Sequence, residues 1–253
     1  IKDHTFSGCT SLTSIHIPNS VKNIGNNAFS NCSSLTSIII PNSVTSIGYH
    51  AFDNTGIYND ASYLENGVLY INNCLIKAKT DITGSYIVKE NTRLIADCAF
   101  ENCSSLISIA IPNSVTNIGN FAFFGCSALT SITIPKDVTS IGEGAFKDCS
   151  LLTSITIPEN VVNIGYDAFS NTPWYNNKPD GVMYIGKLLY KFKGNMPANT
   201  SINIEEGTIS ICDRAFDRCS NLTSIVIPNS VTSIGKSAFE YCKSLKELEL
   251  PNN

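Results

Sequence analysis

The chain has 253 residues, of which 43% are hydrophobic and 15% charged, and its 17 basic and 21 acidic residues leave a net charge of −4. This acidic, charge-poor composition lacks the excess of lysine and arginine that is typical of nucleic-acid-binding proteins, so we expect no nucleic-acid partner. No apolar run approaches the roughly 20 residues that span a bilayer, so we expect no direct membrane insertion. Only three histidines are present, and we expect no metal and no cofactor.

The chain repeats itself every 23 residues, and its clearest copy, residues 129–149, reads L-T-S-I-T-I-P-K-D-V-T-S-I-G-E-G-A-F-K-D-C. A phenylalanine recurs at one position of the repeat, and we call it the marker phenylalanine. Most of these phenylalanines are 23 residues apart, but the distance from Phe52 to Phe100 is 48 residues and that from Phe169 to Phe216 is 47. Each long gap therefore holds one degenerate coil and an insertion. The marker occupies nine positions: Phe6, Phe29, Phe52, Phe100, Phe123, Phe146, Phe169, Phe216 and Phe239.

Each copy predicts a short series of elements. The alternation I-T-I at 132–134 predicts a strand whose isoleucines point inward, and Pro135 ends it. Gly142 indicates a backbone position that a side chain would obstruct. Residues 145–149, spaced as on a helix, predict a bend and one helical turn. Because one copy cannot bury its apolar face alone, we expect the copies to stack into a mainly β solenoid of about nine coils.

The consensus L-x-x-I-x-I-P-x-x-V-x-x-I-G-x-x-A-F-x-x-C resembles the BspA-like leucine-rich repeats of bacterial and protist surface proteins, over nearly the whole chain. The resemblance implies a right-handed solenoid with a parallel sheet lining one face, adhesion to host matrix proteins or to other cells, and no catalytic activity. Residues 1–6 align with 24–29, so the chain starts within a repeat. We expect residues 1–253 to be one solenoid domain from a longer protein, from which a signal peptide or wall anchor could have been lost.

The two insertions, about residues 58–82 and 174–198, align with each other. Residues 67–77 (G-V-L-Y-I-N-N-C-L-I-K) match residues 181–191 (G-V-M-Y-I-G-K-L-L-Y-K) position by position. In each, two apolar runs flank a two-residue turn, which predicts a β-hairpin. Threonine replaces the repeated cysteine just before each insertion, at Thr55 and Thr172.

Aromatic residues gather in the second insertion, where Trp174 lies with Tyr175, Tyr184 and Tyr190. One interpretation is an aromatic knob that binds a partner, since tryptophan and tyrosine anchor interfaces. The other is that these rings cover apolar core where the coil is interrupted. The sequence leaves both interpretations open.

The outward positions of the predicted strands form two stripes along the solenoid. The first is serine in every coil but the last: Ser14, Ser37, Ser85, Ser108, Ser131, Ser154, Ser201 and Ser224, followed by Glu247. The second is our candidate partner-binding surface: His16, Ile39, Ile87, Ala110, Thr133, Thr156, Asn203 and Val226. We expect an apolar patch near Ile39, Ile87 and Ala110, which favours a protein partner. The alternative is a solubilising serine ladder with incidental apolar positions.

Seven cysteines share one slot, three residues after the marker phenylalanine: Cys9, Cys32, Cys103, Cys126, Cys149, Cys219 and Cys242. Stacked thiols point the same way, so we predict a column of buried free thiols rather than a metal or redox site. Cys98 with Cys103, or Cys212 with Cys219, could form a disulfide, although neither spacing is specific.

The charged residues of the last coil have two interpretations. Either they protect an edge strand from pairing with another chain, or they occur there by chance.

Two functions remain. The first is a non-enzymatic binding module at the cell surface, monomeric and extracellular, whose partner is a protein such as fibronectin or fibrinogen. The second is a structural spacer that holds another domain away from the surface. No catalytic group accompanies the abundant serines, since only His16 lies near the serine stripe.

Overall fold

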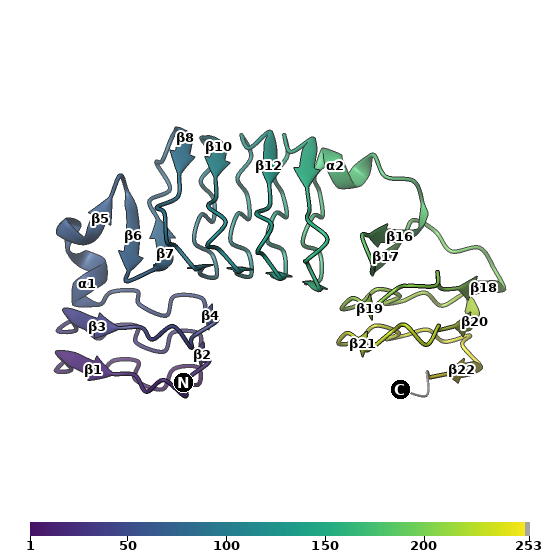
Figure 1. Ribbon diagram of the computed structural model, residues 1–253, viewed down its shortest axis with the longest axis horizontal. Coiled ribbons are helices and arrows are strands. Elements are labelled where there is room, and N and C mark those ends of the chain that lie inside the picture. The colour runs from purple at the N-terminus through teal and green to yellow at the C-terminus, as the bar shows by residue number, and fades with distance from the viewer. Residues whose placement is uncertain (251–253) are drawn as a thin grey trace.

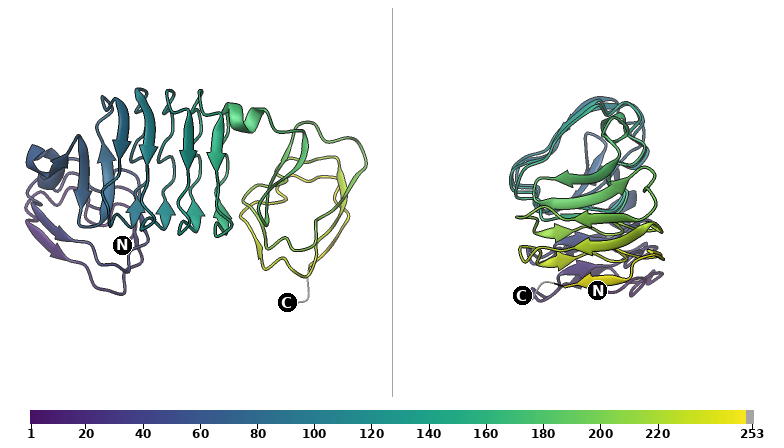
Figure 2. Two further views of the ribbon diagram at one scale, coloured as in Figure 1. Left: turned by 45° about the horizontal axis from the view of Figure 1, so that its top comes forward. Right: turned by 90° about the vertical axis from the view of Figure 1, so that its right-hand side faces the viewer.

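The structure, a computed structural model, describes residues 1–250. Its coils form an arch of three parts, as Figures 1 and 2 show. We call residues 1–55 the N-terminal limb, residues 84–172 the central segment and residues 188–250 the C-terminal limb. The two insertions lie at the junctions between them. Three hydrophobic clusters, one centred on each part, replace the single apolar column of a straight solenoid.

One strand of each coil lies on the outside of the arch (Figure 1). These outer strands lie in three facets, and all their pairings are parallel: β1 with β3 in the N-terminal facet, β8 with β10 and β12 with β14 in the central facet, and β18 with β20 with β22 in the C-terminal facet. Their bounds are β1 Ser14–His16, β3 Ser37–Ile39, β8 Gly84–Ile87, β10 Leu106–Ala110, β12 Ser131–Thr133, β14 Ser154–Thr156, β18 Thr200–Asn203, β20 Leu222–Val226 and β22 Glu247–Glu249.

Each coil also has a two-residue strand on the inside of the arch (Figure 1), which follows the proline in the regular coils. In the central segment these inner strands belong to a seven-stranded sheet with the order β15-β13-β11-β9-β7-β6-β5. Their bounds are β2 Asn23–Ile24, β4 Ser46–Ile47, β9 Leu94–Ile95, β11 Asn117–Ile118, β13 Ser140–Ile141, β15 Asn163–Ile164, β19 Ser210–Ile211 and β21 Ser233–Ile234.

The marker phenylalanines stack through the interior of each part. Phe123 and Phe146 are fully buried, their ring centroids are 5.2 Å apart, and their planes differ by 4°. The Gly142 backbone runs close to the preceding coil, because a Cβ at this residue would lie 2.4 Å from the Asn120 nitrogen. This close approach confirms the role predicted for the glycine.

The predicted helical turn over residues 145–149 was wrong. Alternate amides in this stretch reach the next coil: Phe146 N–H donates to the Ala168 carbonyl at 2.7 Å, and Gly144 N–H to the Tyr166 carbonyl at 2.9 Å. A helix would keep these hydrogen bonds within its own turn. Left-handed residues two before and two after the phenylalanine, here Gly144 (φ 56°) and Asp148 (φ 62°), turn the amides outward.

Both insertions contain the predicted hairpins, and both hairpins are built into the inner sheets. β6 (Val68–Ile71) pairs antiparallel with β7 (Cys74–Ala78), and β7 continues in parallel with β9. Likewise β16 (Gly181–Ile185) pairs with β17 (Leu188–Lys193), which continues in parallel with β19. A short strand, β5 (Leu64–Glu65), adds an edge to the first hairpin.

The threonines that replace cysteine begin the insertions. Thr55 caps α1 (Gly56–Asn59), and Thr172 caps α2 (Pro173–Asn176), because each side-chain oxygen accepts a hydrogen bond from a backbone N–H of the helix. A short 3₁₀-helix (Ala61–Tyr63) follows α1. The chain thus leaves the coil where a hydroxyl replaces a thiol. None of the helices within residues 1–250 has the length and hydrophobicity needed to cross a membrane.

All seven cysteines of the predicted column are free, and neither of the two conceivable disulfides is formed. Five of the seven are buried as predicted, but Cys9 is exposed and Cys242 is half-buried. The Sγ of Cys126 lies 3.1 Å from the Phe100 carbonyl oxygen, and that of Cys149 lies 3.1 Å from the Phe123 carbonyl oxygen. Burial raises the pKa of the Cys149 thiol to about 12. These thiols therefore remain protonated and unreactive at neutral pH.

Candidate functional site

The outer strands expose alternate side chains, as the I-T-I pattern predicts. Their register places Ser85 beside Ser108 across β8 and β10. Ile39, Ile87 and Val226 are 66%, 77% and 60% exposed, respectively. All residues of the second stripe lie at exposed positions: His16, Ile39, Ile87, Ala110, Thr133, Thr156, Asn203 and Val226.

The predicted apolar patch near Ile39, Ile87 and Ala110 forms only in part, because the arch divides the stripe. Ile39 lies on β3 of the N-terminal facet, whereas Ile87 and Ala110 pair across β8 and β10 of the central facet. The first hairpin lies between these strands in the sequence, and the two facets point in different directions (Figure 1). Only Ile87 and Ala110 are brought together.

The central facet contains a groove of about 580 Å³ at the carboxyl ends of β10, β12 and β14. Ala110, Thr133 and Thr156 line it together with Lys136 and Pro158. The side chains of the stripe are small here, so the surface is hollowed. This groove is the strongest candidate for partner binding on the outer face.

The aromatic residues of the second insertion divide between core and surface. Tyr190 is buried at 2% exposure, and its hydroxyl oxygen accepts the Phe169 N–H at 3.4 Å, so it is removed from the candidate surface. Its ring contacts Phe169 edge-on at 5.7 Å, where the phenylalanine stack is interrupted. Tyr175 is half-buried and contacts Tyr190 edge-on.

Trp174 and Tyr184 instead line a cavity of about 370 Å³ between β14 and the second hairpin. The Lys178 ammonium lies 4.7 Å from the Trp174 ring centroid. These two rings therefore both cover core and border a surface cavity, so neither of the two sequence interpretations accounts for them alone.

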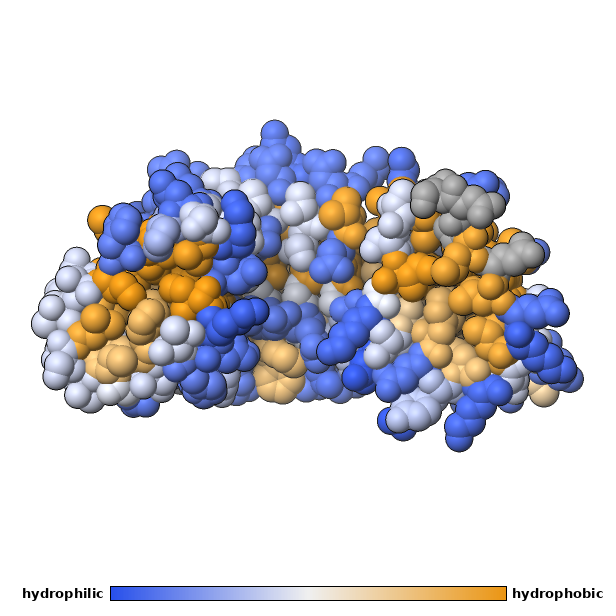
Figure 3. Space-filling model, turned by 90° about the horizontal axis from the view of Figure 1, so that it is seen from below, coloured by the Kyte–Doolittle hydropathy of each residue, from blue (hydrophilic) through white to orange (hydrophobic). Residues whose placement is uncertain are grey.

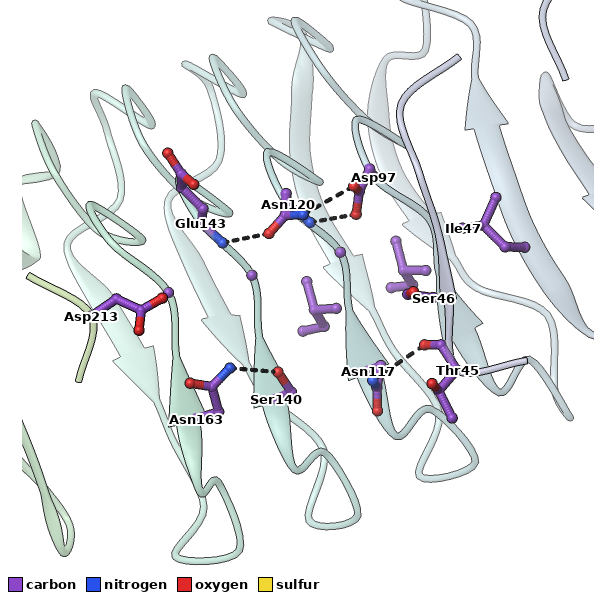
Figure 4. A pocket seen from close by; sticks show the side chains of 15 residues that line it. Thr45, Ser46, Ile47, Asp97, Asn117, Asn120, Ser140, Glu143, Asn163 and Asp213 are labelled. Atoms are coloured by element: carbon purple, nitrogen blue, oxygen red, sulfur yellow. Dashed lines mark hydrogen bonds between the residues drawn. The ribbon is translucent and has the colours of Figure 1, made fainter. Parts of the chain in front are cut away.

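The inside of the arch holds a polar surface that the sequence analysis missed. In Figure 3, hydrophobic residues gather over the two limbs, and hydrophilic residues occupy much of the middle. Asp97, Asn120 and Glu143 follow one another on successive coils: Asp97 accepts the Asn120 N–H at 2.7 Å, and Asn120 accepts the Glu143 N–H at 2.8 Å (Figure 4). These three residues line a pocket, and Asp213 of the C-terminal limb lines it too. A sequence signal for these residues was present, since each directly follows the position that is Ile-Gly in the regular coils.

Beside this pocket lies a second one of about 470 Å³, which shares Asp97, Asn120 and Glu143 with it. Aromatic rings also line it, namely those of Tyr49 and of Phe121 with Phe124. Burial raises the pKa of Asp97, although hydrogen bonds from Asn120 partly oppose this. This pocket lies at the first junction of the arch.

Residues 1–250 contain no cluster of three or more histidine, cysteine or acidic side chains arranged to hold a metal. At the second junction, Asp167 lies 3.0 Å from the Lys191 ammonium and 3.3 Å from that of Lys147. Burial acts to raise the pKa of Asp167, but hydrogen bonds and attraction from the lysines outweigh it and hold the pKa below its ordinary value. This cluster ties the C-terminal limb to the central segment.

Stacked coils with parallel outer strands, shorter inner strands and a phenylalanine column define a leucine-rich repeat solenoid. The family model of the BspA type leucine rich repeat region matches residues 1–83, 71–195 and 189–253 in six copies. The chain therefore belongs to the BspA-type leucine-rich repeat family.

Two solved structures illustrate the likeness. A leucine-rich repeat protein from Bacteroides ovatus is 26% identical, with 99% of this chain and 70% of that chain covered and a TM-score of 0.40. A leucine rich cell surface protein from Faecalibacterium prausnitzii is 29% identical, with 99% and 64% covered and a TM-score of 0.31. The chain thus spans less than two thirds of the second protein. A search of curated proteins finds no match.

Proposed function

We propose that this protein is a non-enzymatic binding module at the cell surface, whose central facet contacts a protein partner. One observation carries the proposal: Ile87 is 77% exposed beside Ala110, and Ala110 lines a groove of about 580 Å³. Exposed branched apolar side chains beside a depression offer the hydrophobic contact that protein interfaces use. Membership of the BspA-type family and the likeness to a leucine rich cell surface protein of F. prausnitzii support a surface location.

Binding would combine many modest contacts. The small side chains of Ala110, Thr133 and Thr156 leave room for a partner segment to lie across the strands. The Thr133 and Thr156 hydroxyls would offer hydrogen bonds, and Ile87 would supply the apolar anchor. Host matrix or plasma proteins such as fibronectin and fibrinogen are the proposed partners.

The test measures binding of the 253-residue chain to immobilised fibronectin, fibrinogen and related proteins at physiological salt. Ile87→Glu is expected to weaken binding by about tenfold or more, since it buries a charge in the contact. Ile39→Glu and Val226→Glu are matched controls, equally exposed isoleucine or valine positions on the other two facets.

Saturable binding that Ile87→Glu reduces and both controls retain would support the central facet. Equal losses in all three variants, or full binding by Ile87→Glu, would refute it. If the wild type binds none of the panel, the spacer function becomes the better account.

A further inference from the structure

The two junctions of the arch are built from equivalent residues. Residues 67–77 of the first hairpin match 181–191 of the second, so Lys77 corresponds to Lys191. Tyr49 and Tyr166 each lie three residues before a marker phenylalanine in the coil that precedes an insertion. The coil that follows each insertion supplies the third and fourth equivalent pairs, on either side of its marker phenylalanine: Cys98 with Arg214, and Glu101 with Asp217.

At the second junction the chain supplies its own cations to the tyrosine. The Arg214 guanidinium carbon lies 4.9 Å from the Tyr166 ring centroid, and the Lys191 ammonium also lies 4.9 Å from it. An Arg214 nitrogen is 3.8 Å from the Asp217 carboxylate. Ring and carboxylate together hold a guanidinium, which is the cation that stacks best on aromatic faces.

At the first junction the equivalent position is open. Cys98 takes the place of Arg214 with the same left-handed backbone, at φ 56° against 52°. Lys77 turns to the Cys98 carbonyl at 2.9 Å and to Glu101 at 3.7 Å. The space that an arginine side chain would fill belongs to the 470 Å³ pocket, in which Tyr49 is 40% exposed.

The rest of this pocket also suits a cation. Asp97, Glu101 and Glu143 contribute three carboxylates to its lining. The ammonium of Lys77 lies 3.7 Å from the Glu101 carboxylate. Phe121 and Phe124, which also line the pocket, contact edge-on at 6.0 Å. A Cβ at Gly144 would lie 2.4 Å from the Phe121 ring, so the glycine makes room for this wall.

We propose that the pocket at the first junction binds the guanidinium of an arginine side chain presented by a partner polypeptide. The ring of Tyr49 stacks on the guanidinium, as that of Tyr166 does on Arg214, and the carboxylates of Glu101 and Glu143 pair with it. The site lies on the inside of the arch, and it does not depend on binding at the central facet.

The test is an NMR titration of the ¹⁵N-labelled chain with N-acetylarginine amide. N-acetylcitrulline amide is the matched control ligand, because it has the same shape without the charge. Saturable shifts are expected at the amides of Tyr49, Cys98 and Asn120 with the arginine ligand alone. Tyr49→Leu is expected to weaken binding roughly 3- to 30-fold, the range for losing a cation–π contact.

Two further variants use the equivalence of the junctions. Cys98→Arg places a guanidinium in the pocket and is expected to abolish binding, while Arg214→Cys opens the second junction and is expected to add shifts near Tyr166. Ile87→Glu, on the outer face, is expected to leave arginine binding unchanged, so failure here and failure at the central facet are distinguishable.

The proposal is overturned if there is no saturable shift at up to roughly 50 mM ligand, if citrulline gives equal shifts, or if a folded Cys98→Arg chain binds undiminished. If Cys98→Arg does not fold, Glu143→Gln replaces it, and unchanged affinity in that variant overturns the proposal. Saturable binding of a neutral oligosaccharide in place of arginine would likewise overturn it.

Discussion

Phe146→Ala tests whether the phenylalanine column holds the coils together. Its ring is fully buried, with centroids 5.2 Å from Phe123 and 5.8 Å from Phe169, so the substitution removes a contact on each side. We expect the free energy of unfolding to fall by about 4 kcal/mol, as for other buried phenylalanines. Phe6 is the matched control, because it is half-buried and stacks only on Phe29, at 5.3 Å. Phe6→Ala is expected to cost about 2 kcal/mol, half as much.

Urea unfolding followed by circular dichroism gives the two losses, and amide hydrogen exchange shows which coils open. The hydrogen-exchange measurement is needed because the coils of a repeat protein can unfold one after another, which a single unfolding curve does not resolve. Faster exchange is expected in the coils on both sides of Phe146, but only in the first coils for Phe6→Ala. Equal losses in the two variants, or a loss below about 1.5 kcal/mol for Phe146→Ala, would refute a column held by stacked rings.

Three more predictions concern single groups. The pKa of Asp167 is held low, so its carboxylate stabilises the fold above its ordinary pKa and the effect is lost as pH falls through the folded value. Asp167→Asn should therefore flatten the fall in melting temperature below about pH 5, and an unchanged acid profile would contradict this. Buried Cys149 should resist iodoacetamide at about pH 8, whereas exposed Cys9 reacts; equal alkylation by mass spectrometry would exclude a protected thiol. Thr172→Val removes the cap of α2 and should cost about 1 kcal/mol in urea unfolding; no loss would show that the cap is dispensable.

The repeating unit could be derived from the sequence alone. The 23-residue period, the inward isoleucines and the outward stripe follow from alternation within one coil and from its recurrence. The hairpins were equally predictable from the sequence, because a two-residue turn between apolar runs is a local signal. The thiol column followed from one slot recurring in stacked coils. In each case the physical cause is short in range or repeated at fixed spacing.

The tertiary structure decided what depends on how coils meet. Alternate amides around Phe146 reach the next coil, and those bonds replace the helical turn that spacing alone predicted. The hairpins join the inner sheets and bend the solenoid, which separates Ile39 from Ile87. The same bend brings Tyr49 of one coil beside Cys98 of another, across an insertion. Since the direction of stacking after an insertion depends on contacts between distant residues, no local pattern in the sequence could specify that pocket.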